Sequence, residues 1–254
     1  MSAPRFFLTD ALPKGEGAVV APLAAEDLHH ARSVLRIAAG EEVELIEPGG
    51  GGWRTRVTAV SADCLEVEPL EQLELRFHPR ITLVQGVAKG EKMDAIVRQA
   101  VEVGAVEIVP VFFERSVVKL DAKKRADRGT RWRRIAKSAA EQSHRDSVPV
   151  VHDPATLEEA LPIIAAHDGV IVVWEEARGQ GLAAGVASWA TEPGVRVALV
   201  VGPEGGLSAT EVARLEELGA VPVTLGATIL RTETAAIVAL ALAVHAFGGL
   251  GAHQ

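Results

Sequence analysis

The chain of 254 residues is long enough for one large domain or two modest ones. Hydrophobic residues make up 48% of it and charged residues 24%, a composition that excludes a disordered chain and fits an ordinary globular protein. The net charge of −8 argues against a protein that coats nucleic acid indiscriminately.

The sequence predicts neither export nor a membrane span. The first ten residues contain no basic start followed by an apolar run, so we expect no secretory signal. The longest apolar stretch, residues 235–250, contains His245 and two glycines and is shorter than the roughly 20 residues that cross a bilayer. A single cysteine, Cys64, cannot form an internal disulfide. We therefore expect a cytoplasmic protein without membrane contact.

Residues 1–75 are typical of a small β-domain. Short apolar segments are separated by turn-forming runs such as the glycines at 49–52. Alternation from Trp53 onward places Arg54 and Arg56 on the same face of a strand. Short strands at this spacing predict a small barrel. The expected elements are strands at 43–46, 53–60 and 64–67 and a brief helix at 25–34.

From about residue 80 the pattern changes to strands that alternate with helices. Near-continuous apolar runs rich in β-branched residues are typical of a parallel sheet covered on both faces. Ser208 and Glu211 form a capping box that opens one of the helices. The sequence therefore predicts an α/β fold, with domains at 1–75 and 76–254. The expected strands are 81–84, 107–111, 170–174, 195–201 and 221–225, and the expected helices are 91–103, 130–142, one from 208 and 232–247.

Positive charge is concentrated in one segment of this acidic chain. From Arg115 to Arg145 there are eleven Lys and Arg residues against three acidic ones, a local charge of +8, whereas the rest of the chain carries −16. Such a segment can steer a polyanion to one face of the protein. The same distribution fits a helix surface that contacts only solvent, and the charge alone favours neither interpretation.

Several familiar functional signatures are missing. The sequence contains neither a GxGxxG dinucleotide fingerprint nor a GxxxxGK[ST] phosphate loop. Its eight histidines do not fall into the spacings of zinc sites, and no GxSxG elbow occurs. We therefore expect no metal.

Two glycine turns follow neighbouring strands. The first, GPEGG at 202–206, comes directly after an apolar strand, at the end where open α/β sheets bind ligands. The second begins at Gly226 and leads to Arg231 at the start of the last helix. An arginine there opposes the helix dipole, so a function is plausible, although Arg231 could simply pair with Glu233. Each turn could also be a tight connection without a ligand.

Several segments of the sequence resemble those of a known family. The segments QGVAKGEKMD (85–94), Arg115-Ser116, EQSHR (141–145) with Pro149, GPEGG (202–206) and LGATILRTETA (225–235) are similar to those of the RsmE family. These are SPOUT-class methyltransferases that act on N3 of a uridine in small-subunit ribosomal RNA. Phe6, His30, Leu35 and Arg36 are similar to the family's PUA-like domain. His144 departs from the family, which commonly has a small residue there.

The resemblance implies a C-terminal SPOUT α/β domain with a trefoil knot, behind a PUA-like N-terminal β-barrel that binds RNA. It implies S-adenosylmethionine as cofactor, ribosomal RNA as partner and a homodimer. The nearly all-round apolar last helix, which needs cover from a sheet or a second subunit, is compatible with a dimer. The implied cofactor-binding residues are Gly202, Pro203, Glu204, Gly205, Gly206, Leu225, Gly226, Ile229, Leu230, Arg231, Thr234 and Ala235.

For catalysis we predict Arg231 and Arg115 as stabilisers of a uridine anion or as phosphate contacts. Glu204 is a candidate base, or it braces its loop by accepting backbone hydrogen bonds. The predicted RNA-binding residues are Arg32, Arg36, Arg54, Arg56, Arg131, Arg133, Arg134, Lys137 and Arg145. Two alternatives stay open: a SPOUT methyltransferase acting on a ribose 2′-hydroxyl or on transfer RNA, and a non-catalytic RNA-binding assembly factor.

Overall fold

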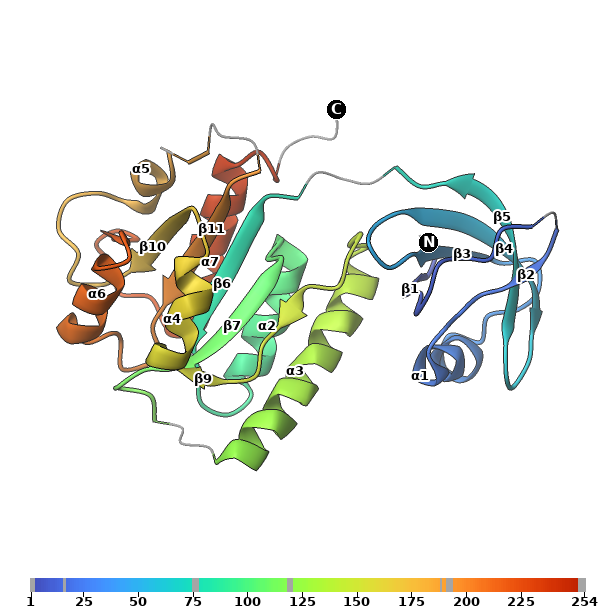
Figure 1. Ribbon diagram of the computed structural model, residues 1–254, viewed down its shortest axis with the longest axis horizontal. Helices are drawn as coiled ribbons and strands as arrows, with labels where there is room; N and C mark the ends of the chain where they lie inside the picture. The colour runs from blue at the N-terminus through green and yellow to red at the C-terminus, as the bar shows by residue number, and fades with distance from the viewer. Residues whose placement is uncertain are drawn as a thin grey trace. The chain divides into compact units, whose positions relative to one another are not determined.

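The computed structural model describes residues 3–15, 17–74, 78–117, 121–187, 189–190 and 194–250. Two compact units make up the chain (Figure 1). The first comprises Met1–Arg76 together with Ala140–Val148, and the second comprises Phe77–Ala139 together with Pro149–Gln254. The segment Ala140–Val148 thus groups with the first unit, although the sequence alone placed it in the second domain. The division into domains at residue 75 stays a prediction.

A five-stranded sheet forms the first unit, in the order β1-β3-β4-β5-β2. β1 runs parallel to β3, and the other neighbours are antiparallel. Beyond the two edge strands, the backbone N–H of Thr9 donates to the carbonyl of Pro22 at 2.8 Å, which links the edges as a barrel requires. The elements are β1 (Arg5–Phe7), β2 (Val19–Val20), α1 (Ala25–His29), a π-helical turn (His30–Val34), β3 (Glu42–Ile46), β4 (Gly52–Val60) and β5 (Leu65–Gln72).

The alternation predicted for β4 is present. Thr55 and Val57 are buried, and Val57 packs into a core that contains Phe6 and Leu45. The two arginines between the inward-facing residues lie on the outer face, where their side chains are about half exposed. The sequence therefore determined this strand from its period of two.

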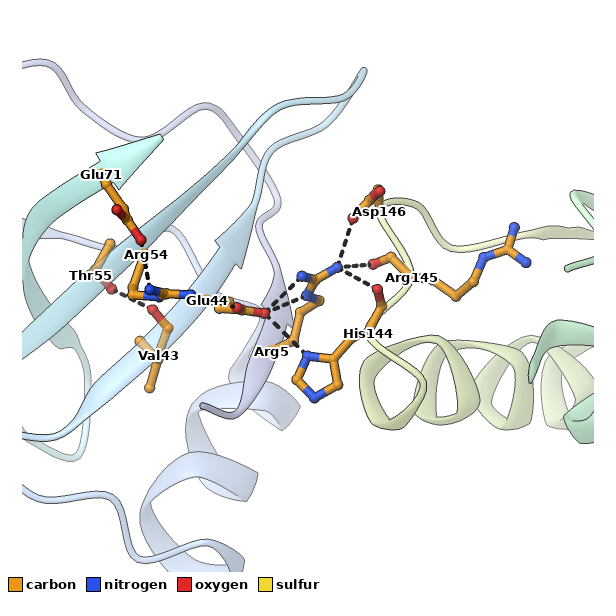
Figure 2. Close-up of polar contacts among 9 residues, drawn as sticks. All are labelled: Arg5, Val43, Glu44, Arg54, Thr55, Glu71, His144, Arg145 and Asp146. Atoms are coloured by element: carbon orange, nitrogen blue, oxygen red, sulfur yellow. Dashed lines mark hydrogen bonds and ion pairs between the residues drawn. The ribbon is translucent and has the colours of Figure 1, made fainter. Parts of the chain in front are cut away.

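Arg5 fastens the 140–148 segment to the sheet of the first unit (Figure 2). Its guanidinium donates to Glu44 Oε2 at 2.9 Å, to Asp146 Oδ1 at 2.8 Å and to the carbonyl oxygen of His144 at 2.6 Å. All three charged side chains are buried, so each depends on the others for neutralisation. Burial alone would raise the pKa of Glu44, but hydrogen bonds from Arg5 and His144 outweigh it and hold that pKa below its usual value.

His144 is the residue that departs from the family pattern. Its φ of +52° lies in the left-handed region, which residues without a bulky side chain adopt most easily. The ring Nδ1 lies 3.1 Å from Glu44 Oε2, so the imidazole gains a partner that a smaller residue would lack.

A parallel sheet forms the second unit, in the order β12-β10-β11-β6-β7-β8, with β9 paired to the end of β7. The residues of its central strands are buried almost without interruption, as the apolar runs predicted. The strands are β6 (Arg80–Gly86), β7 (Glu107–Phe112), β8 (Val150–Val151), β9 (Ala155–Thr156), β10 (Gly169–Val173), β11 (Arg196–Val201) and β12 (Val221–Val223).

Helices cover both faces of this sheet (Figure 1). On one face, α4 and α6 pack on the valines of the central strands. On the other, α7 packs against β6, β11 and α2. The helices are α2 (Lys92–Val103), α3 (Ala122–Gln142), α4 (Leu157–Ala165), α5 (Leu182–Val186), α6 (Ala209–Glu216) and α7 (Thr232–Ala246).

The third helix begins eight residues earlier than predicted. Asp121 Oδ1 accepts the backbone N–H of Lys124 at 2.9 Å, which makes Asp121 a capping residue at the start of α3. Gly129 lies inside the helix. A Cβ at Gly129 would lie within 1.9 Å of the Asp153 carboxylate, so the glycine permits a close approach. The sequence analysis also missed β1, β2, β8, β9, α4 and α5.

The last helix has one buried face and one exposed apolar edge. Ala236, Ala239 and Leu240 are fully buried, whereas Val238 and Leu242 are exposed. The helix is apolar on nearly all sides, but the chain itself buries only one of its faces. Within the described residues, no helix combines the length and the apolarity needed to cross a bilayer.

The Arg5 network yields a stability prediction. Arg5→Met should lower the free energy of unfolding by about 3–5 kcal/mol, because it leaves Glu44 and Asp146 buried without their cation. Arg56→Met is the matched control: Arg56 is about half exposed and lies 3.8 Å from Glu42, so its loss should cost less than about 1 kcal/mol. Urea denaturation of the whole chain measures both, and losses of equal size would contradict the assignment.

Candidate active site

A cavity of about 450 Å³ lies at the carboxyl ends of β10, β11 and β12 in the second unit. Open α/β sheets bind their ligands at this edge. Its volume lies within the range of about 300–1,000 Å³ that is usual for small-molecule sites. The lining residues are Lys92, Val173, Trp174, Glu175, Val201, Gly202, Pro203, Glu204, Gly206, Leu207, Thr224, Leu225, Gly226, Ala227, Thr228, Ile229, Leu230, Arg231, Thr232 and Ala235.

Both glycine turns border the cavity with backbone. In the first, the N–H of Gly206 donates to the carbonyl of Pro203 at 2.9 Å, and Gly206 has a φ of +72°. In the second, Gly226 has a φ of +112° and donates its N–H to Thr224 Oγ1 at 3.2 Å. Residues with a side chain rarely adopt these angles, so glycine is needed at both positions.

The floor of the site is a close crossing of two chain segments. A Cβ at Gly86, the last residue of β6, would lie 2.3 Å from the backbone nitrogen of Pro203. Thr232, the first residue of α7, donates its hydroxyl to the carbonyl of Gly202 at 2.6 Å. The amide of Gln85 in turn donates to Thr232 Oγ1 at 3.0 Å. The ends of β6 and β11 and the start of α7 are therefore held at one point.

A lysine connects two carboxylates at the rim. Lys92 Nζ lies 3.5 Å from Glu204 Oε1 and 3.2 Å from Glu233 Oε2. Glu204 Oε1 also accepts the backbone N–H of Lys89 at 3.0 Å, so Glu204 does brace its loop. The backbone N–H of Glu233 itself, and then Lys92, lower the pKa of the Glu233 carboxyl despite slight burial.

The two arginines proposed for catalysis are both exposed but are held differently. Arg231 occupies the N-cap of α7 without a capping side-chain hydrogen bond, and it lines the cavity. Glu233, its alternative partner, pairs with Lys92, and the charge of Arg231 also helps to lower the pKa of the Glu233 carboxyl. Arg115 Nη1 donates to the carbonyl of Gly205 at 3.3 Å, beside the first glycine turn. The guanidinium of Arg231 is therefore available to a ligand.

Ten of the twelve residues that the sequence assigned to the cofactor border the cavity, and Gly205 and Thr234 do not. A Cβ at Gly205 would lie 2.8 Å from Cβ of Arg115 and 2.9 Å from its carbonyl oxygen, so this glycine permits close packing on Arg115. A cofactor contact at Gly205 stays a prediction, and Gly206, its neighbour with positive φ, lines the cavity.

Sequence reasoning missed a third wall of the cavity. Trp174 and Glu175 follow β10, and Lys92 begins α2. The first glycine after β10 is Gly179, six positions beyond the end of the strand, so Trp174 and Glu175 gave no local signal. Its position after a strand was a signal, because the carboxyl ends of all the parallel strands lie on one edge.

Some arginines of α3 pair with a carboxylate and others do not. Asp94 accepts hydrogen bonds from Nε and Nη2 of Arg131, at 3.0 and 2.5 Å. Arg133 Nη1 donates to Asp153 Oδ1 at 2.9 Å. Arg134 is exposed, and among the described residues no carboxylate pairs with it. Part of the basic segment therefore stabilises the fold.

The other predicted RNA-binding residues differ in accessibility. Arg145 is only 3% exposed, so its side chain is not part of the surface. Lys137 is half-buried, whereas Arg32 and Arg36 are exposed. On β4, Arg54 pairs with Glu71 at 2.6 Å and Arg56 lies 3.8 Å from Glu42. Lys119, within the basic segment, lies outside the described residues.

Family models match both units of the chain. The model of an RNA methyltransferase domain matches residues 76–244. The model of an RNA methyltransferase PUA domain matches residues 23–70, which include β3, β4 and most of β5. The fold and the site thus define an RNA methyltransferase domain preceded by a PUA domain.

Full-length relatives narrow this class. The chain is 36% identical over 242 residues to ribosomal RNA small subunit methyltransferase E of Bacillus subtilis, covering 93% of this chain and 94% of the relative. It is 34% identical to the protein of the same name in Mycobacterium bovis, covering 92% and 88%. The chain belongs to the ribosomal RNA small subunit methyltransferase E family.

Solved structures agree with this membership. The ribosomal RNA small subunit methyltransferase E of Neisseria gonorrhoeae, bound to S-adenosyl methionine, matches with a TM-score of 0.80 and 32% identity over 94% of this chain and 96% of that one. A methyltransferase of Legionella pneumophila in complex with the same cofactor matches with a TM-score of 0.81 and 28% identity over 97% and 98%.

The close crossing at Gly86 predicts a strong response to one methyl group. Gly86→Ala places a Cβ against the backbone of Gly202 and Pro203, so we expect the free energy of unfolding to fall by about 1–3 kcal/mol, the usual cost of overpacking. Gly181→Ala is the control, since its nearest neighbour is the Thr224 carbonyl oxygen at 3.8 Å. Thermal melts of both variants measure the effect, and a Gly86→Ala protein as stable as the parent would refute the crossing.

Proposed function

We propose that the chain transfers a methyl group from S-adenosylmethionine to N3 of a uridine in small-subunit ribosomal RNA. The observation that supports this most directly is the cavity formed by the two glycine turns at the carboxyl ends of β11 and β12. The name shared by the relatives, and the cofactor bound to two of the related structures, support the same reaction.

The residues of the cavity fit this cofactor. Gly206 and Gly226 carry no side chain, so a ligand in the cavity can come close to the backbone of both turns. Leu225, Leu230 and Ala235 offer apolar surface for an adenine ring. Glu204 and Glu175 supply negative charge for a cationic ligand. When bound, the cofactor supplies a methyl group on a positively charged sulfur.

Uridine N3 sets two demands on the protein. It lies on the pairing edge of the base, so the nucleotide must be unpaired or flipped outward. It also bears a proton that must leave before or during attack. We propose that Arg231, aided by Arg115, stabilises the uridine anion and that Glu204 accepts the proton. The available guanidinium of Arg231 at the cavity supports its role.

We propose that residues 1–75 form the RNA-binding domain and residues 76–254 the catalytic domain. Arg32, Arg36 and Arg134 supply exposed guanidinium groups for phosphates, and Lys137 adds to them. Arg54, Arg56, Arg131 and Arg133 contribute less, because each lies beside a carboxylate. Arg145 can contribute only after a rearrangement that exposes it.

We further propose a homodimer, a trefoil knot, a cytoplasmic location and no metal requirement. The exposed Val238 and Leu242 on α7 support a second subunit, because they offer apolar surface for it to cover. The bond from Thr232 to Gly202 supports a knot, since it holds the last helix against the crossing of β6 and β11. An RNA substrate supports the cytoplasmic location. A sulfonium cofactor already carries an activated methyl group, so no metal is needed.

The turn at Gly226 offers the test of this function. Gly226→Val forces a β-branched residue to a φ of +112°, at a cost of about 1–3 kcal/mol unless the turn moves. We expect S-adenosylmethionine binding, measured by calorimetry, and N3-methyluridine formation, measured by nucleoside mass spectrometry of incubated ribosomal RNA, to be lost together. Gly219→Val is the control, because Gly219 has a φ of +80°, has open space around it and lines no part of the cavity.

The possible outcomes separate the alternatives. Heat of binding followed by ribose methylation, or by methylation of transfer RNA only, would replace the proposed substrate. A parent chain that gives no heat with S-adenosylmethionine would favour the assembly-factor alternative. Equal loss of binding in both glycine variants would mean that the turn at Gly226 is not specific to the site.

The contrast between Arg134 and Arg133 tests the RNA surface. Arg134→Ala should weaken RNA binding for all sequences and reduce the slope of log affinity against log salt by about one, the value for one lost phosphate contact. Arg133→Ala should change the slope less and lower the melting temperature instead, because its partner is Asp153. Filter binding over a salt series measures the slope. An unchanged slope in Arg134→Ala would favour a helix surface that contacts only solvent.

A further inference from the structure

Among the described residues that line the cavity, Lys92 is the one cation that pairs with carboxylates from two different segments. It is the first residue of α2, and its side chain is 37% exposed. Its ammonium lies between Glu204, in the first glycine turn, and Glu233, in the first turn of α7. These carboxylates come from segments more than 100 positions away in sequence, so Lys92 brings their charges together only in the folded chain.

The two oxygens of Glu204 are in different environments. Oε1 accepts the backbone N–H of Lys89 at 3.0 Å and lies 3.5 Å from Lys92 Nζ. For Oε2, no hydrogen-bond partner is present among the described residues. Glu204 borders the cavity with its side chain 28% exposed, so a bound base can reach it. One oxygen therefore fixes the carboxylate while the other stays available.

We propose that Lys92 is a positioning residue that holds Glu204 in place as the proton acceptor, an inference that rests on the proposed function. The N3–H proton of the uridine passes to Glu204 Oε2 while N3 forms a bond to the methyl carbon. The electron pair of the broken carbon–sulfur bond stays on sulfur, and no further reactant is needed. Lys92 itself does not touch the reacting atoms.

The surrounding charges explain why a lysine is suited to this role. Glu175 and Arg231 line the same cavity, Arg115 contacts the neighbouring Gly205, and Glu233 lies on the other side of Lys92. Glu233 anchors the ammonium, so the lysine stays beside Glu204 instead of extending into solvent.

Single-turnover kinetics at saturating S-adenosylmethionine tests this proposal. Lys92→Met should lower the methyl-transfer rate by about tenfold or more, because the carboxylate is no longer held in place. Lys92→Arg should restore most of the rate, because it keeps the charge. Glu204→Gln should lower the rate by about 10²-fold or more, as expected when a general base is lost. Calorimetry should show that Lys92→Met binds S-adenosylmethionine within about threefold of the parent, a difference below 1 kcal/mol.

Arg214→Met is the matched control. Arg214 also bridges two carboxylates, Glu158 and Glu217, but lies outside the cavity. Its methyl-transfer rate should match that of the parent. A Lys92→Met rate equal to that of the parent, or a loss of rate that arginine does not restore, would overturn the positioning role. A parent chain that transfers no methyl group to ribosomal RNA would instead overturn the proposed function itself.

Discussion

The close crossing of β6 and the turn after β11 is the constraint on which the active-site region depends. At Gly86 and Pro203 two backbones approach so closely that a single methyl group has no room. Thr232 ties the start of α7 to the same point through Gly202. Because these three segments are fixed there, the two glycine turns have only one position relative to each other. The cavity between them follows from that position.

The cations of this acidic chain serve distinct purposes that the charge pattern cannot distinguish. Arg5 is buried and neutralises two carboxylates, so it stabilises the first unit. Arg131 and Arg133 reach back to aspartates of the second unit. Arg134 is exposed without a carboxylate in an ion pair with it among the described residues, and Arg231 is exposed at the cavity. The partner of each guanidinium, rather than its position in a basic segment, decides which arginines can meet a substrate.

Local patterns predicted the elements whose burial is periodic. The period of two in β4 and the capping box at Ser208 both appear as expected. α3 begins earlier than predicted, and Gly129 inside it approaches the distant Asp153, a contact that local periodicity does not show. Short strands such as β8 contain too few residues to show any period, so only their pairing with β7 defines them.

The sequence by itself determined the two turns and the parallel sheet, because glycine conformation and apolar periodicity are local properties, and the family resemblance supplied half of the residues around the cavity. Only the tertiary structure decided that Lys92 meets Glu204 and Glu233, that Gly205 packs on Arg115, and that Arg145 is buried. These contacts join segments distant in the chain, and their energies depend on separation and burial. Neither quantity exists until the chain has folded.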